Sequence, residues 1–127
     1  MEIEIQFTGK SLAASKVAFT RGEGAVVEFL GIVRGTEGQT RISGLVYEIY
    51  QPMARSMICR IVEGLNVDHP CLAFSIVHRY GFVPVGEPSV LIRVHALRRT
   101  EAIRMLEDFL HRLKADVPIW KSASAPC

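Results

Sequence analysis

The chain has no long apolar run and no organised set of cysteines. Its uninterrupted apolar segments all fall well short of the roughly 20 residues that a membrane-spanning helix needs. Its first residues, MEIEI, are acidic and alternating, unlike the basic and then apolar start of a signal peptide. The three cysteines (Cys59, Cys71 and Cys127) lack the close pairs of a zinc site and the even number of a disulfide framework. We therefore expect a cytoplasmic protein with free thiols.

Sequence motifs for cofactors are also missing. The four histidines (His69, His78, His95 and His111) form neither an HxH nor an HExxH pattern, and the sequence contains no glycine-rich phosphate loop. Lys and Arg number 15 against 13 Asp and Glu, and the resulting charge of +2 is too small to attract nucleic acid through bulk electrostatics. We therefore expect no metal or nucleotide cofactor, no nucleic-acid partner and no membrane partner.

The pattern of apolar residues predicts a mixed α+β protein. A chain of 127 residues, 49% of them hydrophobic, is expected to form a single domain over residues 1–127. Strands with β-rich or alternating sequences are interspersed with helical periodicity, which favours helices packed on one face of a mixed sheet. The expected strands are 2–7, 25–33, 45–50, 72–78 and 89–97, and Pro88 is expected to begin the last of them. The expected helices are 11–19, Pro52 to His69-Pro70, and one that runs from an N-cap at Thr100 to Lys114. Residues 34–44 are expected to form a mobile loop, and an extended tail is expected after the last helix.

The end of the last predicted helix places a lysine beside an apolar stripe. At 100° per residue this stripe holds Ala102, Ile103, Leu106, Phe109, Leu110 and Leu113, with Lys114 on its shoulder. Partial burial would favour the neutral amine, which can act as a nucleophile or base. The alternative is an ordinary helix-terminal lysine that extends into solvent. The following segment, with Pro118 and Trp120, is either plain core closure or a stiff connection that returns Lys121 toward Lys114.

Other basic residues lie at the ends of predicted elements, where sites are commonly built. Arg98 and Arg99 precede a helix whose N-terminal N–H groups and dipole would help them bind a phosphate. The simpler alternative is that both arginines are solvated at a turn. For Arg34 the corresponding alternative is a solvated charge at the end of a strand. We interpret His78 as a hydrogen-bonded structural histidine rather than as a general base.

Several motifs follow one another along the chain. They are FLGIVR (29–34), YEIYQPMA (47–54), HRYG (78–81), VGE (85–87) and the segment from Leu113-Lys114 to Pro118-Ile119-Trp120-Lys121. In this order they resemble the molybdopterin synthase catalytic (large) subunit family over roughly residues 22–122. The resemblance implies an α/β hammerhead fold, with a mixed/antiparallel sheet, helices on one face and a small β subdomain. It also implies a central homodimer within a heterotetramer.

The function that the resemblance implies is a sulfurtransferase of molybdenum cofactor biosynthesis. A small ubiquitin-like carrier subunit would insert its C-terminal thiocarboxylate into a pocket, where its sulfur converts cyclic pyranopterin monophosphate to molybdopterin. By position in the motifs, Lys114 and Lys121 match the catalytic lysines, and the substrate-binding set would be Ile32, Val33, Arg34, Arg98, Arg99 and the same two lysines. Lys114 is the candidate acyl-accepting or proton-transferring group, and Lys121 the electrostatic support. The alternatives are a non-catalytic relative that binds the carrier protein, or a binder of small anionic metabolites.

Overall fold

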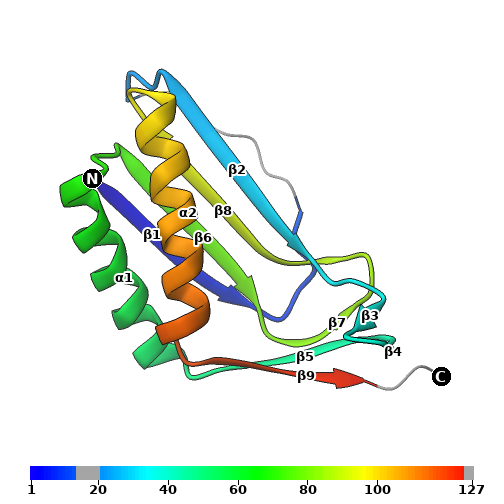
Figure 1. The fold of residues 1–127 in the computed structure, drawn as a ribbon. Helices are drawn as coiled ribbons and strands as arrows, with labels where there is room; N and C mark the ends of the chain where they lie inside the picture. The colour runs from blue at the N-terminus through cyan, green and yellow to red at the C-terminus, as the bar shows by residue number, and fades with distance from the viewer. Residues whose placement is uncertain (14–20, 125–127) are drawn as a thin grey trace.

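The structure is a computed structural model that describes residues 1–13 and 21–124, so the helix predicted over 11–19 falls mostly outside the described residues. Two helices interrupt the series of strands along the described chain, and both helices lie on the same side of the larger sheet (Figure 1). The elements are β1 (Glu2–Thr8), β2 (Ala25–Ile32), β3 (Thr36–Glu37), β4 (Thr40–Arg41), β5 (Gly44–Ile49), α1 (Gln51–Asp68), β6 (Ala73–Arg79), β7 (Gly81–Pro84), β8 (Pro88–Ala96), α2 (Arg99–Asp116) and β9 (Ile119–Ser124).

The larger sheet has four strands in the order β1-β6-β8-β2. The first pair, β1 with β6, is parallel, and the other two pairs are antiparallel. The parallel pair requires a long crossover, because two parallel strands cannot be joined by a tight turn. These observations confirm the predicted α+β class with helices on one face of a mixed sheet.

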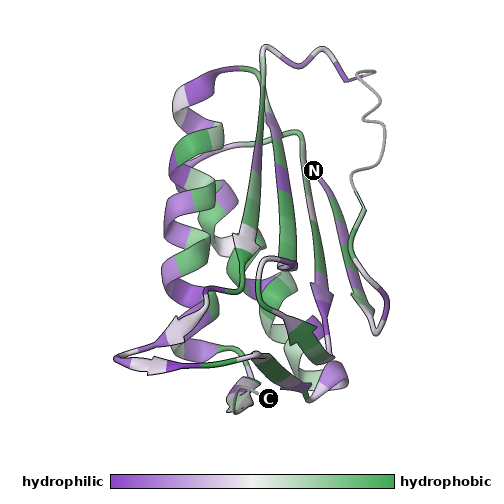
Figure 2. Cartoon of the chain, turned by 90° about the vertical axis from the view of Figure 1, so that its right-hand side faces the viewer, coloured by the Kyte–Doolittle hydropathy of each residue, from purple (hydrophilic) through white to green (hydrophobic). Residues whose placement is uncertain are grey.

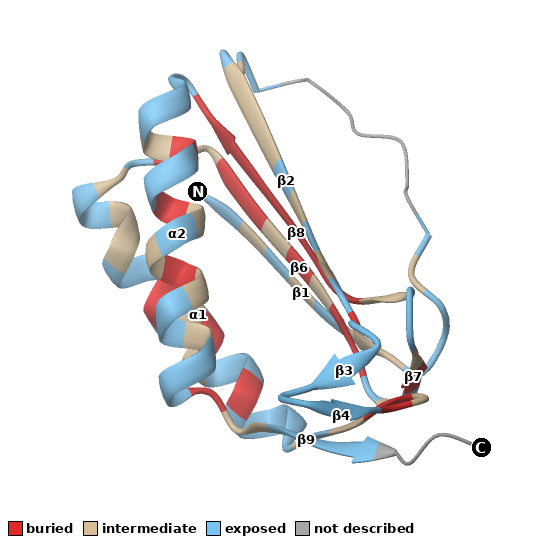
Figure 3. Ribbon diagram, turned by 45° about the vertical axis from the view of Figure 1, so that its right-hand side comes forward, coloured by how far each residue is buried: buried red, intermediate tan, exposed pale blue. Residues whose placement is uncertain are grey.

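The core lies between this sheet and the helices. Alternate residues of β6 and β8 face the helices, because successive side chains of a strand point to opposite faces. Phe74 and Phe109 are almost completely buried, and their rings pack with centroids 4.6 Å apart. In Figure 2 hydrophilic and hydrophobic residues alternate along both helices, and in Figure 3 the buried residues of the helices face the strands. Burial of side chains of this size contributes about 1.5–3 kcal/mol each.

A smaller sheet lies at one end of the larger one (Figure 1). Its order is β7-β5-β9, and it encloses a second small core of Val33, Ile42, Leu45 and Val83. The small β subdomain is therefore confirmed. One detail of the prediction was wrong: residues 34–44 contain the β3–β4 hairpin instead of forming only a loop. The predicted extended tail forms strand β9, paired along β5. In both cases the hydrogen-bond partners that order the segment lie on another strand.

The boundaries of the two helices agree with the sequence patterns at most positions. Pro52 lies in the first turn of α1, and His69 caps its C-terminal end, as predicted. The predicted N-cap Thr100 was wrong, because α2 begins at Arg99 and its N-cap residue is Arg98. The carbonyl of Arg98 already accepts a hydrogen bond from the N–H of Ala102 at 3.4 Å, so Thr100 is within the first turn. Neither described helix is long and apolar enough to cross a membrane.

Candidate active site

A pocket of about 550 Å³ opens where the C-terminal end of α2 meets the small sheet. Its walls come from the end of β2, from β5, β6 and β8, from α2 and from β9. The lining residues are Phe29, Gly31, Ile32, Arg34, Tyr47, His78, Ser89, Val90, Leu110, Leu113, Lys114, Ile119 and Lys121. Segments that are far apart in the sequence therefore share one concave surface, which is the usual form of a small-molecule site.

Three cations from separate elements line this pocket. Arg34 follows β2, Lys114 lies in the last turn of α2, and Lys121 lies on β9. No carboxylate is present among the described residues that line it, although Glu37 approaches Lys121 from the β3–β4 hairpin, with Nζ and Oε1 3.9 Å apart. Three cations against one nearby carboxylate create a positive potential that attracts an anion. The pocket therefore suits a negatively charged ligand.

The structure brings together some of the predicted site residues and separates others. Ile32, Arg34, Lys114 and Lys121 all line the pocket. Val33 instead points into the core of the small sheet and is only 3% exposed. This difference follows from strand geometry, because neighbouring side chains of an extended segment point in opposite directions.

Arg98 and Arg99 lie at the other end of α2 from Lys114. The 15 helical steps from Arg99 to Lys114 span roughly 22 Å at 1.5 Å per residue. Both arginines are exposed, and neither lines the pocket of its own chain. Within one chain they cannot contact the same small ligand as Lys114.

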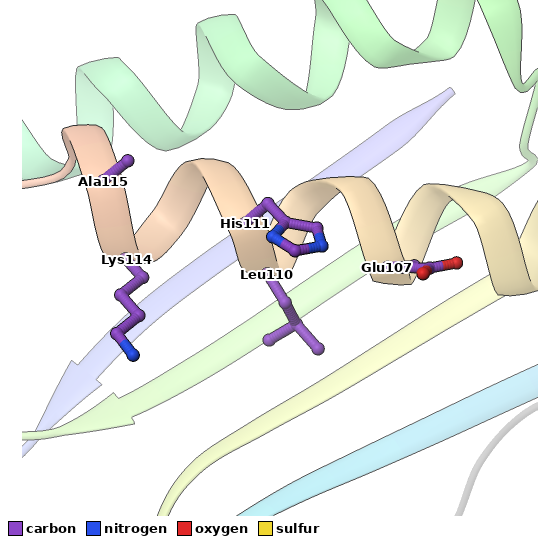
Figure 4. Close-up of a pocket in the computed structure, with 5 residues that line it drawn as sticks. All are labelled: Glu107, Leu110, His111, Lys114 and Ala115. Carbon is purple, nitrogen blue, oxygen red and sulfur yellow. The ribbon is translucent and has the colours of Figure 1, made fainter.

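The prediction that Lys114 is partly desolvated was wrong for the single chain, because this residue is exposed. The buried stripe of α2 is centred on Ala102, Met105 and Phe109, whereas Ile103 is 50% exposed. Lys114 lies on the same side of α2 as Ile103 and is therefore outside the buried stripe. In Figure 4 Lys114 and Leu110 project from the same side of α2, and both also border a second pocket formed with Glu107, His111 and Ala115.

The connection after α2 directs Lys121 into the pocket. The carbonyl of Pro118 accepts a hydrogen bond from the N–H of Tyr50 at 3.2 Å, and Ile119 begins the pairing of β9 with β5. Lys121 thereby lines the same pocket as Lys114, as the stiff-connection interpretation predicted. Core closure by Trp120 was wrong, because this side chain is 58% exposed. It lies on the edge strand, where alternation turns it away from Lys121.

His78 is a pocket residue that sequence reasoning assigned only a structural role. It lies on β6 two residues after the buried Ile76, so strand alternation places it on the helix-facing side of the sheet. The sequence alone contained this alternation, so it could have indicated the side of the sheet on which His78 lies. Its Nδ1 is 3.0 Å from the carbonyl oxygen of Arg79, and its ring meets the ring of Tyr47 edge-on at 5.2 Å. Burial lowers the pKa of His78, and the hydrogen bond to Arg79 opposes this shift.

Candidate metal ligands and reactive thiols are not gathered at this pocket. Residues 1–13 and 21–124 contain no group of three His, Cys, Asp or Glu side chains arranged to hold a metal ion. Cys59 and Cys71 are free thiols, while Cys127 is outside the described residues. Burial, with a smaller effect from Glu101, raises the pKa of Cys71 to about 11. A thiol with so high a pKa is a poor nucleophile near neutral pH.

The fold and the pocket together define a class of protein. Two helices cover one face of a mixed four-stranded sheet, a smaller sheet lies at its end, and a cationic pocket lies between them. The sequence model of the MoaE protein family matches residues 5–116, which is most of the chain. The chain belongs to the MoaE protein family, in agreement with the resemblance of its motifs.

Comparisons with individual proteins agree with this family. A protein of Pyrenophora tritici-repentis named molybdopterin synthase catalytic subunit is 35% identical over 111 residues, which cover 87% of this chain and 62% of that protein. The chain spans about three fifths of the length of the first curated relatives it matches. The structure of molybdopterin synthase from Staphylococcus aureus is 33% identical, with a TM-score of 0.83 and coverage of 98% of this chain and 90% of that chain.

A more distant structure shares the fold. It is a complex of subunits 1 and 2 of molybdopterin-converting factor from Helicobacter pylori, with a TM-score of 0.72 and 23% identity. The alignment covers 95% of this chain and 83% of that one. At this level of identity the likeness establishes the common architecture.

Proposed function

We propose that this protein is the catalytic subunit of a molybdopterin synthase and transfers sulfur to cyclic pyranopterin monophosphate. The observation that carries the proposal is the pocket in which Arg34, Lys114 and Lys121 converge from three separate elements. A phosphate-bearing precursor and a thiocarboxylate are both anions, so both are suited to this pocket. The family and the names of the relatives support the same activity.

The sulfur donor in this proposal is the C-terminal thiocarboxylate of a small ubiquitin-like carrier subunit. A flexible, extended tail can enter a pocket that a folded domain cannot, and the cations would bind its terminal charge. A Helicobacter pylori protein of the same fold has been solved in a complex of two subunits, which supports the proposal of a partner subunit. Lys114 is the proposed acyl-accepting or proton-transferring group, and Lys121 provides electrostatic support.

The exposure of Lys114 means that one chain alone does not desolvate its amine. In the proposed complex, the carrier tail and the precursor would exclude water from the pocket and strengthen every electrostatic contact inside it. This arrangement fits an enzyme whose site is completed by its two substrates.

A homodimer is part of the proposal. Leu30, Ile32, Phe82 and Val85 are large apolar side chains with 40% or more of their surface exposed, and a subunit interface would bury such surface. Arg98 and Arg99 are too far from the pocket of their own chain, so they can bind the precursor only if a second copy brings them to it.

The decisive experiment mixes the purified protein with a thiocarboxylated carrier and the cyclic precursor, and measures dithiolene formation. Dithiolene above a control that lacks the protein is the expected result. Binding of the carrier without dithiolene would identify a non-catalytic relative, and binding of inorganic phosphate without carrier binding would identify a binder of anionic metabolites.

A further inference from the structure

Apart from Lys114, whose amine the proposed function already assigns to acyl acceptance or proton transfer, the charged groups of the pocket supply donors but no base. Arg34, Lys114 and Lys121 can donate hydrogen bonds and stabilise negative charge, but their cationic forms cannot accept a proton. The polar side chains that remain among the described lining residues are Tyr47, His78 and Ser89. Only an imidazole among these changes its charge near neutral pH. A proton removed in a step that the Lys114 amine does not serve is therefore best accepted by His78.

The orientation of the His78 ring leaves the right nitrogen available. Nδ1 lies 3.0 Å from the carbonyl oxygen of Arg79, and a carbonyl can only accept, so Nδ1 carries the proton. In the neutral ring Nε2 then has a free lone pair. Within residues 1–13 and 21–124 Nε2 has no hydrogen-bond partner, yet it is not among the fully buried polar atoms that lack one. It is therefore accessible from the pocket.

The surroundings of His78 favour its neutral form. Tyr47 of β5 meets the ring edge-on, and Phe7 of β1 and Val90 of β8 are its cross-strand neighbours. The charged groups that share the pocket are cationic: Arg34 after β2, Lys114 of α2 and Lys121 of β9. Burial lowers the pKa of His78 below its ordinary value of about 6.5. The imidazole is consequently an unprotonated acceptor at neutral pH.

We propose that His78 is a catalytic base of this pocket, and that its Nε2 accepts the proton of the water that releases the carrier from the transferred sulfur. This inference rests on the proposed function. Once the thiocarboxylate sulfur is bonded to the pterin, the carrier acyl carbon and the pterin share that sulfur as a thioester. Water then forms a C–O bond to the acyl carbon while its proton passes to Nε2, and the C–S bond breaks. The products are the carrier carboxyl group and a pterin thiolate, and the imidazolium returns its proton to solvent.

The variant that tests this role is His78→Asn. Asparagine keeps an N–H donor near the position of Nδ1 for the Arg79 carbonyl, but it has no basic nitrogen. In single-turnover experiments we expect carrier release to be at least about 100-fold slower, the low end for loss of a general base. Mass spectrometry should show a covalent carrier–pterin adduct that accumulates, while precursor affinity changes little. If His78 were purely structural, its replacement would not cause this adduct to accumulate.

The matched control is His111→Asn, which removes an exposed histidine on α2 that does not line this pocket. Its release rate should equal that of the wild type. A second measurement needs no variant of His78. The release rate of the wild type should fall as pH decreases, because protonation removes the base, and its apparent pKa should match the pKa of His78 measured by NMR, below about 6.5.

The outcomes distinguish this inference from the function on which it rests. If the wild type forms no dithiolene with carrier and precursor, the proposed function is wrong and the role of His78 fails with it. If the wild type is active but folded His78→Asn releases the carrier at the normal rate, only the role of His78 is wrong. If His78→Asn does not fold, a pH profile without an acidic limb at the NMR pKa of His78 would equally overturn it.

Discussion

Lys121 lies directly opposite Tyr47 in the antiparallel ladder between β9 and β5. Residues opposite one another in a ladder present their side chains on the same face of the sheet. The ring of Tyr47 in turn meets the ring of His78 at 5.2 Å. The pairing of the C-terminal strand therefore places Lys121 on the same wall of the pocket as Tyr47 and His78, and the following predictions depend on this wall and on the cations around it.

Lys114→Ala should abolish most of the activity without a loss of stability. Dithiolene formation should fall at least about 100-fold, the low end for loss of a proton-transfer group. The thermal midpoint should stay nearly unchanged, because the side chain is exposed. Lys114→Arg should not restore activity, since a guanidinium stays protonated and cannot act as an amine. Arg104→Ala, an exposed cation elsewhere on α2, is the control. Near-normal turnover of Lys114→Ala would show that the Lys114 amine takes no part in the chemistry.

Arg34→Ala should weaken binding of the cyclic precursor by about 1–3 kcal/mol, the range for a charge-assisted hydrogen bond. Carrier binding should change less, because the carrier contacts a wider surface. Isothermal calorimetry measures both affinities. Arg41→Ala on the β3–β4 hairpin provides a comparable loss of an exposed arginine outside the pocket. Equal precursor affinity in wild type and Arg34→Ala would show that the anion binds elsewhere.

Arg99→Ala should weaken precursor binding at the pocket of a second copy of the chain, because Arg99 is too far from the pocket of its own chain. Light scattering should show a dimer at micromolar concentration, and calorimetry should show a loss of about 1–3 kcal/mol. Mixed dimers of Arg99→Ala and Lys114→Ala should recover activity, because one of their two pockets then keeps both residues. A stable monomer, or mixed dimers no more active than the two variants alone, would contradict this arrangement.

Gly44→Ala should disrupt the small sheet and reduce both stability and activity. A Cβ atom at Gly44 would lie 2.4 Å from the carbonyl oxygen of Val83 on β7, and backbone at this distance must move. The shift would disturb β5, which carries Tyr47 and pairs with β9. Gly64→Ala is the matched control, since no neighbour among the described residues lies within 4 Å of a Cβ built there and alanine favours the helix by about 1 kcal/mol. Chemical denaturation should separate the two variants, and equal midpoints would refute the predicted strain.

Elements with a strong internal pattern were predictable from sequence. The apolar run from Ala25 corresponds to β2, and the helix predicted from Pro52 to His69-Pro70 corresponds to α1. The short strands β3, β4 and β7 were not predicted, and β9 was predicted only as extended chain. β3 and β4 have two residues each and pair with one another, whereas β7 and β9 depend on hydrogen bonds to β5, which is distant in sequence. Local propensity carries no information about such partners.

The motifs by themselves determined the family, the α+β class and the cations at the ends of the elements, because these depend on residue identity and local period. Only the tertiary structure decided which of these residues meet. It placed Arg34, Lys114 and Lys121 at one pocket and Arg99 at the opposite end of α2. It left Lys114 exposed and made His78 part of the pocket wall. Periodicity fixes the direction in which a side chain points along its own element, but whether that direction leads to solvent, core or a shared cavity depends on the elements packed against it.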